Sequence, residues 1–206
     1  MKLIVTETIL YLSFLGMDIF GIGNSTPIKF VSILILTLSV LDFRDKTVSA
    51  ALVFTLIADV FLLLLDRWYA AGVLCFLGVQ ILYAARLQKE SRGNGALLSF
   101  LLPAAAGLTA CGGYGCGLTE TLAASYITLF AVNLARACLL AKRTGENKWI
   151  LFAAGLALFF CCDLCVGLHN MPGTGGPTLQ RFAALAMWAF YLPGQVLIRM
   201  SAYTEK

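Results

Sequence analysis

Two aspartates stand inside long apolar stretches of this sequence. Asp59 lies in "LIADVFLLL" and Asp163 lies in "LFFCCDLCVGL". A charge at the centre of a bilayer costs about 2.5–3.5 kcal/mol on insertion scales, so such residues usually face the interior of a helix bundle and serve a function. Carboxyl groups that share a buried site can take up and release protons near neutral pH. We therefore treat Asp59 and Asp163 as the first candidate functional residues.

Uncharged polar side chains at helical spacing accompany the two aspartates. They form three pairs, which are Gln80 with Tyr83, Tyr126 with Asn133, and Tyr191 with Gln195. The members of a pair are three, seven or four residues apart, and such residues project from one face of a helix. Several helices that present polar groups at similar depths indicate one shared cavity. The alternative for each pair is an interhelical hydrogen bond that only stabilises packing, worth ~0.6 kcal/mol.

The elements that position these side chains are predicted to be transmembrane helices. Hydrophobic residues make up 60% of the chain and charged residues 13%, and the mean hydropathy is +0.86. A water-soluble domain of 206 residues with this composition would expose large apolar patches. A span needs about 20 mainly apolar residues. The polar interruptions predict eight spans, at residues 3–20, 28–41 (short), 47–65, 69–87, 95–114, 118–141, 148–168 and 179–202. We expect an all-α, polytopic transmembrane bundle in which residues 1–206 form a single membrane domain.

The distribution of basic residues predicts the orientation of the chain, because cytoplasmic loops of membrane proteins retain Lys and Arg. Eight spans place both termini on one side. That side holds eleven basic residues, which are Lys2, Arg44, Lys46, Arg86, Lys89, Arg92, Lys142, Arg143, Lys148, Arg199 and Lys206. The opposite side holds Lys29, Arg67 and Arg181, and Arg136 lies inside the sixth span. The asymmetry predicts that both termini are cytoplasmic, and it explains the net charge of +4 without a nucleic-acid partner.

The cysteines and the histidine predict neither a metal site nor a cofactor site. The seven cysteines lack the His partners and the paired spacing of a zinc site, and we interpret them as small packing residues. A disulfide between Cys111 and Cys116, near the non-cytoplasmic surface, remains the alternative. His169 is the only histidine. We expect it in the last non-cytoplasmic loop, with a solvated surface role.

Four segments, taken in order, resemble the signature segments of the YhhN family, the integral membrane proteins that include the lysoplasmalogenases. They are "LIADVFLLL", "GVLCFLGVQILYAARL", "LFFCCDLCVGL" and "AFYLPGQVLI". The resemblance covers nearly the whole chain in order and spacing. It places the family's site positions on Asp59, on Gln80 and Tyr83, on Asp163 and on Gln195. Lys29, in "PIKFVSILI", resembles the family's Lys at the start of its second span.

This sequence departs from the family pattern at three positions. Ala58 replaces the usual Gly before the first aspartate, and Cys162 replaces the usual Ser before the second. Gln80 stands where the family has His. The third departure matters most, because glutamine cannot exchange a proton near neutral pH whereas histidine can.

The resemblance implies cleavage of the vinyl ether of a lysoplasmalogen to a fatty aldehyde and a glycerophospho-alcohol. The predicted multi-pass topology indicates the cell membrane as the location. A vinyl ether reacts by protonation of its outer alkene carbon, and water then captures the oxocarbenium ion. Asp59 and Asp163 are expected to supply the acid and the base, with Asp59 as the acid. The expected substrate-binding residues are Lys29, Gln80, Tyr83, Tyr126, Asn133, Tyr191 and Gln195.

Two other functions remain open at this point. A lipid-binding or lipid-translocating membrane protein would keep the polar cavity without the chemistry, and Gln80 favours that alternative. A proton-coupled carrier would use Asp59 and Asp163 as its titrating groups. A hydrolase should release product in the absence of a pH gradient. A lipid binder should retain its ligand without converting it, and a carrier should show uptake into vesicles that follows a pH gradient.

Overall fold

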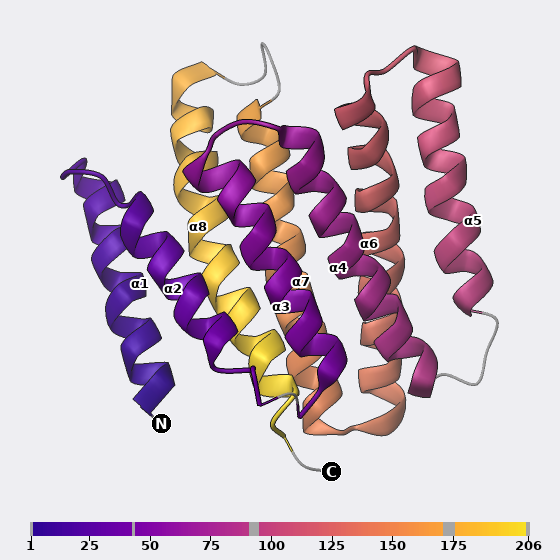
Figure 1. The fold of residues 1–206 in the computed structure, drawn as a ribbon, viewed down its shortest axis with the longest axis horizontal. Helices are drawn as coiled ribbons and strands as arrows, with labels where there is room; N and C mark the ends of the chain where they lie inside the picture. The colour runs from indigo at the N-terminus through magenta and orange to yellow at the C-terminus, as the bar shows by residue number, and fades with distance from the viewer. Residues whose placement is uncertain (1, 43, 91–94, 171–175, 205–206) are drawn as a thin grey trace.

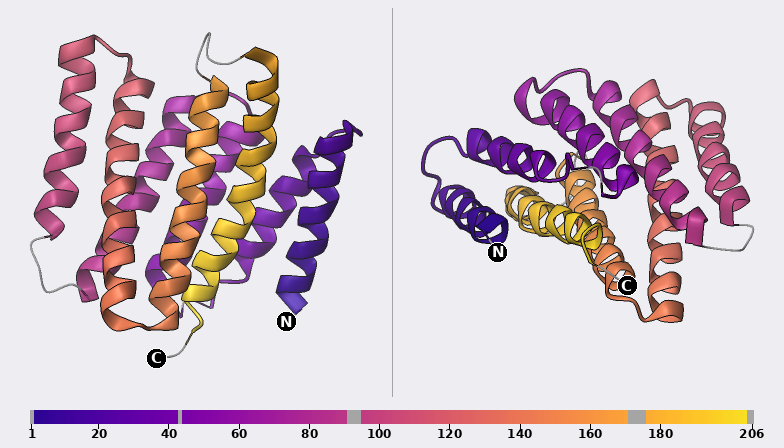
Figure 2. Two further views of the ribbon diagram at one scale, coloured as in Figure 1. Left: turned by 180° about the vertical axis from the view of Figure 1, so that it is seen from behind. Right: turned by 60° about the horizontal axis from the view of Figure 1, so that its bottom comes forward.

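The computed structural model describes residues 2–42, 44–90, 95–170 and 176–204, and these ranges are helical except for short turns. The elements are α1 (Lys2–Phe20), α2 (Thr26–Leu38), α3 (Lys46–Asp59), η1 (Val60–Leu64), α4 (Tyr69–Glu90), α5 (Gly95–Leu108), η2 (Thr109–Gly113), α6 (Leu118–Thr144), α7 (Asn147–Asn170) and α8 (Gly176–Ser201). The two η elements are single turns of π-helix that extend α3 and α5. The helices stand side by side in one bundle, with α1 and α5 at opposite edges (Figure 1; Figure 2). The predicted all-α bundle is confirmed.

The helix lengths agree with a polytopic membrane protein. Within the described residues, six helices are long and apolar enough to cross a bilayer, namely α1, α3 with η1, α4, α6, α7 and α8. The apolar helices Thr26–Leu38 and Leu97–Gly113 are shorter. Successive helices alternate in direction, so the first turn of α1 and the last turn of α8 lie at the same end of the bundle (Figure 1). This is the arrangement that an even number of spans requires.

Two glycines allow α7 and α8 to approach closely. A Cβ atom added to Gly155 would lie 2.8 Å from the carbonyl oxygen of Gly194 and 2.9 Å from the backbone nitrogen of Ile198. A Cβ atom added to Gly194 would lie 3.0 Å from the carbonyl oxygen of Gly155. Small residues at helix crossings let membrane helices gain van der Waals contact in the absence of a hydrophobic driving force. Gly155 and Gly194 therefore determine how closely α8 packs against α7.

A proline inside α8 connects this helix to α1. Pro193 has no backbone N–H, so the carbonyl of Ala189, four residues earlier, loses its helical donor. The hydroxyl of Tyr11 in α1 donates a hydrogen bond to that carbonyl at 3.2 Å. The polar group that the proline releases is thereby satisfied by a neighbouring helix, as the apolar interior of a membrane protein requires.

Arg86 joins four helices at the end of the bundle that carries the termini. Its Nε donates to Asp45 Oδ2 at 2.8 Å, and its Nη atoms donate to the hydroxyl and carbonyl oxygens of Ser201 at 2.9 and 3.1 Å. Its guanidinium carbon lies 4.4 Å from the ring centroid of Phe152 in α7. Asp45 also accepts hydrogen bonds from two backbone N–H groups in the first turn of α3. Arg86 therefore ties α4 to the start of α3, to α7 and to the end of α8.

Substituting Arg86 by Gln is expected to lower the free energy of unfolding by about 1.5–3 kcal/mol, the usual contribution of hydrogen bonds to a charged group. Arg86 is only 6% exposed, so water cannot replace its partners. Thermal or denaturant unfolding in detergent measures the change. Arg67→Gln is the matched control, because Arg67 is exposed in the η1–α4 turn. Equal stability of the two variants would contradict the structural role of Arg86.

Candidate active site

Asp59 lies at the end of α3 and forms the first of two aspartate–tyrosine pairs. The Tyr191 hydroxyl of α8 donates a hydrogen bond to Asp59 Oδ2 at 2.7 Å. Both side chains are 5% exposed. The π-helical turn η1 begins directly after Asp59, and such turns occur frequently at functional sites because they interrupt the regular helical ladder. The hydrogen bond fixes one carboxyl oxygen of Asp59 at the junction between the two helix types.

Asp163 in α7 forms the second pair. The Tyr126 hydroxyl of α6 donates a hydrogen bond to Asp163 Oδ2. Asp163 is partly exposed, whereas Tyr126 is buried. In the part of the chain that the structure describes, the Oδ1 atoms of Asp59 and Asp163 have no hydrogen-bond partner. Each carboxyl group is thus oriented by a phenol and retains one oxygen for another molecule.

Aromatic rings and one cysteine connect the two pairs. The ring of Phe159 lies 5.7 Å from that of Tyr191, and Phe76 lies 5.6 Å from Phe159 and 6.0 Å from Tyr126. Cys162, next to Asp163 in sequence, is buried in the same side-chain cluster as Tyr126, Phe159 and Tyr191. The four helices α3, α6, α7 and α8 therefore bring the two predicted aspartates into one region of the bundle.

Gln80 and Asn133 form an amide pair between α4 and α6. The Nδ2 atom of Asn133 donates to the backbone oxygen of Gln80 at 2.8 Å and lies 3.1 Å from its Oε1. Both side chains are fully buried. Gln80 Nε2 and Asn133 Oδ1 have no hydrogen-bond partner among the described residues. The pair therefore presents one donor and one acceptor to a polar ligand.

Tyr83 and Gln195 add further buried polar groups. Both side chains have 0% exposure, and neither the Tyr83 hydroxyl nor the Gln195 amide has a partner in the described ranges. Thr55, one helical turn before Asp59, is buried in the same way. Thr55 could have been predicted from the sequence, because it precedes Asp59 by four residues and so lies on the same helical face. Buried polar groups without a protein partner are uncommon in native structures, and each of these can serve a bound ligand.

Lys29 lies at the start of α2. Its contact with the aspartate–tyrosine pairs is indirect, through the ring of Trp188. Its ammonium group forms an ion pair with Asp18 Oδ2 at 2.7 Å and lies 4.5 Å from the Trp188 ring centroid. Trp188 in turn contacts the Tyr191 ring edge to face, at 5.4 Å. Asp18 therefore neutralises much of the positive charge that Lys29 would otherwise offer to a substrate.

The remaining sequence predictions concern the cysteines and the histidine. All seven cysteines are free, so Cys111 and Cys116 are not joined. His169 is exposed as expected, but the predicted loop position is wrong, because α7 continues to Asn170 and places His169 in its last turn. Across the described ranges, no group of three or more His, Cys, Asp or Glu side chains is placed to hold a metal ion.

The fold and the site together define a class of protein: a multi-pass membrane bundle with acidic and amide side chains buried between its helices. The sequence model of the YhhN family matches residues 24–202, a range that contains all nine candidate site residues and leaves out α1. The chain belongs to the YhhN family. Searches of the curated proteins and of the solved structures give no match.

Proposed function

We propose that this protein is an intramembrane hydrolase that cleaves the vinyl ether bond of lysoplasmalogens by acid–base catalysis. The observation that carries the proposal is the pair of carboxyl groups, Asp59 and Asp163, each held by one phenol and brought together inside the bundle. Membership of the YhhN family is consistent with this reaction. The same family resemblance and the basic residues at the end of the bundle that carries the termini support a cell-membrane location with cytoplasmic termini.

The proposed reaction begins with a proton transfer from Asp59 to the outer alkene carbon of the vinyl ether, which is the alkene carbon that is not bonded to oxygen. The carbon bonded to oxygen then carries the positive charge of an oxocarbenium ion. Asp163 accepts a proton from water as the water oxygen bonds to that carbon, giving a hemiacetal. Asp163 then returns this proton to the glycerol oxygen as the bond between that oxygen and the hemiacetal carbon breaks. The hemiacetal hydroxyl gives its proton to Asp59, so that the aldehyde forms and both carboxyl groups return to their starting states. The water-handling role belongs to Asp163, because it is the less buried of the two.

Tyr126 and Tyr191 orient the carboxyl groups in this mechanism. Each phenol binds Oδ2 and so directs Oδ1 to the reacting atoms. Gln80 takes a binding role in place of the family's histidine, because its Nε2 donor is available to an oxygen of the substrate. Tyr83 and Gln195 supply further hydrogen bonds to the glycerol and phosphate oxygens. No proton transfer through Gln80 is required.

Replacing Tyr191 by Phe is expected to lower kcat about tenfold to hundredfold, since a hydrogen bond to a charged group contributes about 1.5–3 kcal/mol. Phe retains the ring contacts with Phe159 and Trp188, so the fold should persist. Steady-state aldehyde release measures kcat, and thermal unfolding checks the fold. Tyr203→Phe is the control, because Tyr203 bonds to Asp42 and Ser39 at the end of the chain, away from the aspartates. Equal losses in the two variants would argue against an orienting role for Tyr191.

The proposed reaction is tested with purified protein in detergent and three lysophospholipids of equal chain length, which carry a vinyl ether, an alkyl ether or an ester. We expect aldehyde from the vinyl ether alone, because the alkyl ether and the ester have no alkene carbon to protonate. A folded protein that binds the vinyl ether lipid without releasing aldehyde would overturn the hydrolase and favour the lipid binder. Uptake that follows a pH gradient in vesicles, without aldehyde, would favour the carrier.

A further inference from the structure

A groove on the lipid-facing side of the bundle lies between α4, α5 and α6, apart from the two aspartates. Its volume is about 390 Å³, within the range of about 300–1,000 Å³ typical of small-molecule sites. Its walls are mainly apolar, with Leu77, Ile81, Phe100, Pro103, Ala104 and Leu129 among them. Ile81 is 50% exposed and Phe100 is 72% exposed. The groove therefore opens to the medium around the bundle, which in a membrane is the acyl-chain region of the lipid.

A cationic side chain closes one end of this groove. Arg136 of α6 lines it, and its Nη atoms donate hydrogen bonds to Ser99 Oγ and Gln88 Oε1, both at 2.8 Å. These partners are uncharged. Among the described residues, no carboxylate lies within ion-pair distance of Arg136. No carboxylate of the described residues therefore neutralises this guanidinium group at the edge of the apolar groove.

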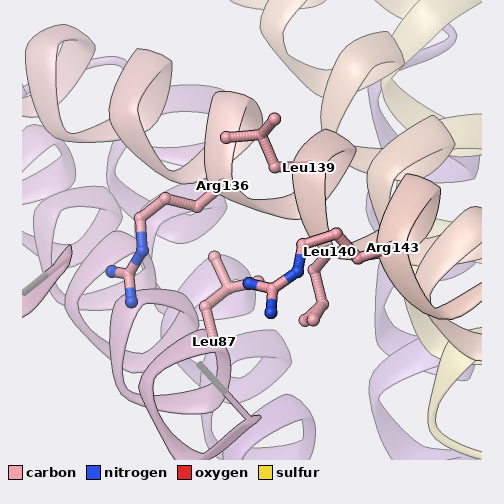
Figure 3. A pocket seen from close by; sticks show the side chains of 5 residues that line it. All are labelled: Leu87, Arg136, Leu139, Leu140 and Arg143. Carbon is pink, nitrogen blue, oxygen red and sulfur yellow. The ribbon is translucent and has the colours of Figure 1, made fainter. Parts of the chain in front are cut away.

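A second hollow of about 150 Å³ continues from Arg136 along α6. It is lined by Leu87, Arg136, Leu139, Leu140 and Arg143. In Figure 3 the guanidinium group of Arg143 lies beside Leu87 of α4, and that of Arg136 lies on the opposite side of Leu87. The structure also gives Arg143 no carboxylate partner within the described ranges. Two arginines that no described carboxylate neutralises therefore flank one hollow at the end of the groove.

The depths of the two arginines correspond to the surface region of one leaflet. Arg143 is the penultimate residue of α6, and Arg136 precedes it by seven residues, or about 10 Å along the helix axis. A cation at the depth of Arg136 is costly unless it reaches the interface or pairs with an anion. A lipid phosphate at the level of Arg143 can pair with both side chains, because arginine binds phosphate through parallel N–H···O bonds.

We propose that this groove binds an anionic phospholipid of the surrounding membrane, with an acyl chain between α4, α5 and α6 and the phosphate between Arg136 and Arg143. The site is distinct from the proposed active site. Gln80 and Asn133 of the same helices are fully buried toward the bundle interior, whereas Ile81 and Leu129 line the groove. The lipid would lie in this groove beside α5, the helix at the edge of the bundle (Figure 1).

The charge requirement is tested by native mass spectrometry of the purified protein with phosphatidylglycerol and phosphatidylcholine. We expect tighter binding of phosphatidylglycerol, and affinity about twenty-five-fold lower in the R136Q/R143Q double variant, since each basic residue near an anionic headgroup contributes about fivefold. Lys142→Gln is the matched control, because Lys142 is exposed in the same helical turn and lines neither hollow. Its affinity should stay within about twofold of the wild type.

A second variant tests the groove without removing a charge. Ala85 lines the groove, and Ala85→Trp would fill part of it. Ala131→Trp, at an exposed position of α6 outside both hollows, adds the same side chain as a control. We expect only Ala85→Trp to weaken phosphatidylglycerol binding. Equal binding of the two lipids by the wild type, or unchanged phosphatidylglycerol affinity in Ala85→Trp or in a folded R136Q/R143Q protein, would overturn the proposal. If the double variant does not fold, the phosphatidylglycerol affinity of Ala85→Trp alone tests the proposal.

Discussion

Substituting Asp59 or Asp163 by Asn is expected to lower the rate of aldehyde release from a lysoplasmalogen about 10²- to 10⁴-fold, the range of a lost general acid or base. Asparagine has nearly the shape of aspartate, and its carbonyl oxygen can still accept the hydrogen bond from Tyr191 or Tyr126. It can neither deliver a proton to the alkene carbon nor take one from water. Initial rates at saturating lipid, for each variant and for the wild type, measure the effect.

Asp66→Asn is the matched control for these two variants. Asp66 is exposed in the turn after η1, where its carboxylate accepts a hydrogen bond from Tyr69 at 2.7 Å. Its removal should leave the rate within about twofold of the wild type, because surface substitutions away from a site usually have small effects. Lipid retention by the Asp59 and Asp163 variants separates lost chemistry from lost binding. Either variant turning over at a third of the wild-type rate would exclude that residue as an essential acid or base.

Substituting Gly155 by Leu is expected to destabilise the bundle by about 3 kcal/mol or more, the upper range for overpacking. Even a Cβ atom at this position would lie 2.8 Å from the carbonyl oxygen of Gly194. The clash involves backbone atoms, which cannot rotate away, so α7 and α8 must separate. Because α8 carries Tyr191 and Gln195, activity should fall together with stability. Thermal unfolding in detergent and aldehyde release measure the two effects.

Gly167→Leu provides the comparison on the same helix. Gly167 is exposed, and a Cβ atom there would meet nothing within 4 Å. Leucine has the higher helix propensity by almost 1 kcal/mol, so this variant should be as stable as the wild type or slightly more stable. A Gly155→Leu protein that unfolds at the wild-type temperature would show that the close α7–α8 crossing is not needed.

The helices and the inward direction of the candidate residues could be predicted from the sequence. The transmembrane spans follow from long apolar runs, and the observed helices begin and end within a few residues of the predicted limits. Spacings of three, four and seven residues placed Gln80 with Tyr83, Tyr191 with Gln195, and Tyr126 with Asn133 on common faces, and all six are buried. Periodicity suffices for such predictions because a helix fixes the direction of each side chain.

The partners across helices could not be predicted, because they depend on how the helices pack. Asp59 and Tyr191 are far apart in sequence, and nothing local pairs them. The sequence indicates only a cytoplasmic charge for Arg86, although this residue is 6% exposed, donates hydrogen bonds to Asp45 and Ser201, and lies over the Phe152 ring. The sequence predicts that Lys29 binds substrate, but packing of α1 against α2 places Asp18 beside it as an ion-pair partner. These contacts require the three-dimensional arrangement of α1, α2, α3, α4, α7 and α8.

The position of the transferred proton tests the proposed mechanism most directly. Wild-type protein would hydrolyse a lysoplasmalogen in D₂O, with the aldehyde reduced at once to the alcohol and analysed by mass spectrometry. Protonation of the outer alkene carbon predicts one deuterium on the carbon next to the original carbonyl. Authentic aldehyde incubated with the Asp59→Asn protein in D₂O measures background exchange. Aldehyde without deuterium at that carbon, or no aldehyde from a folded protein, would contradict acid catalysis by the buried aspartates.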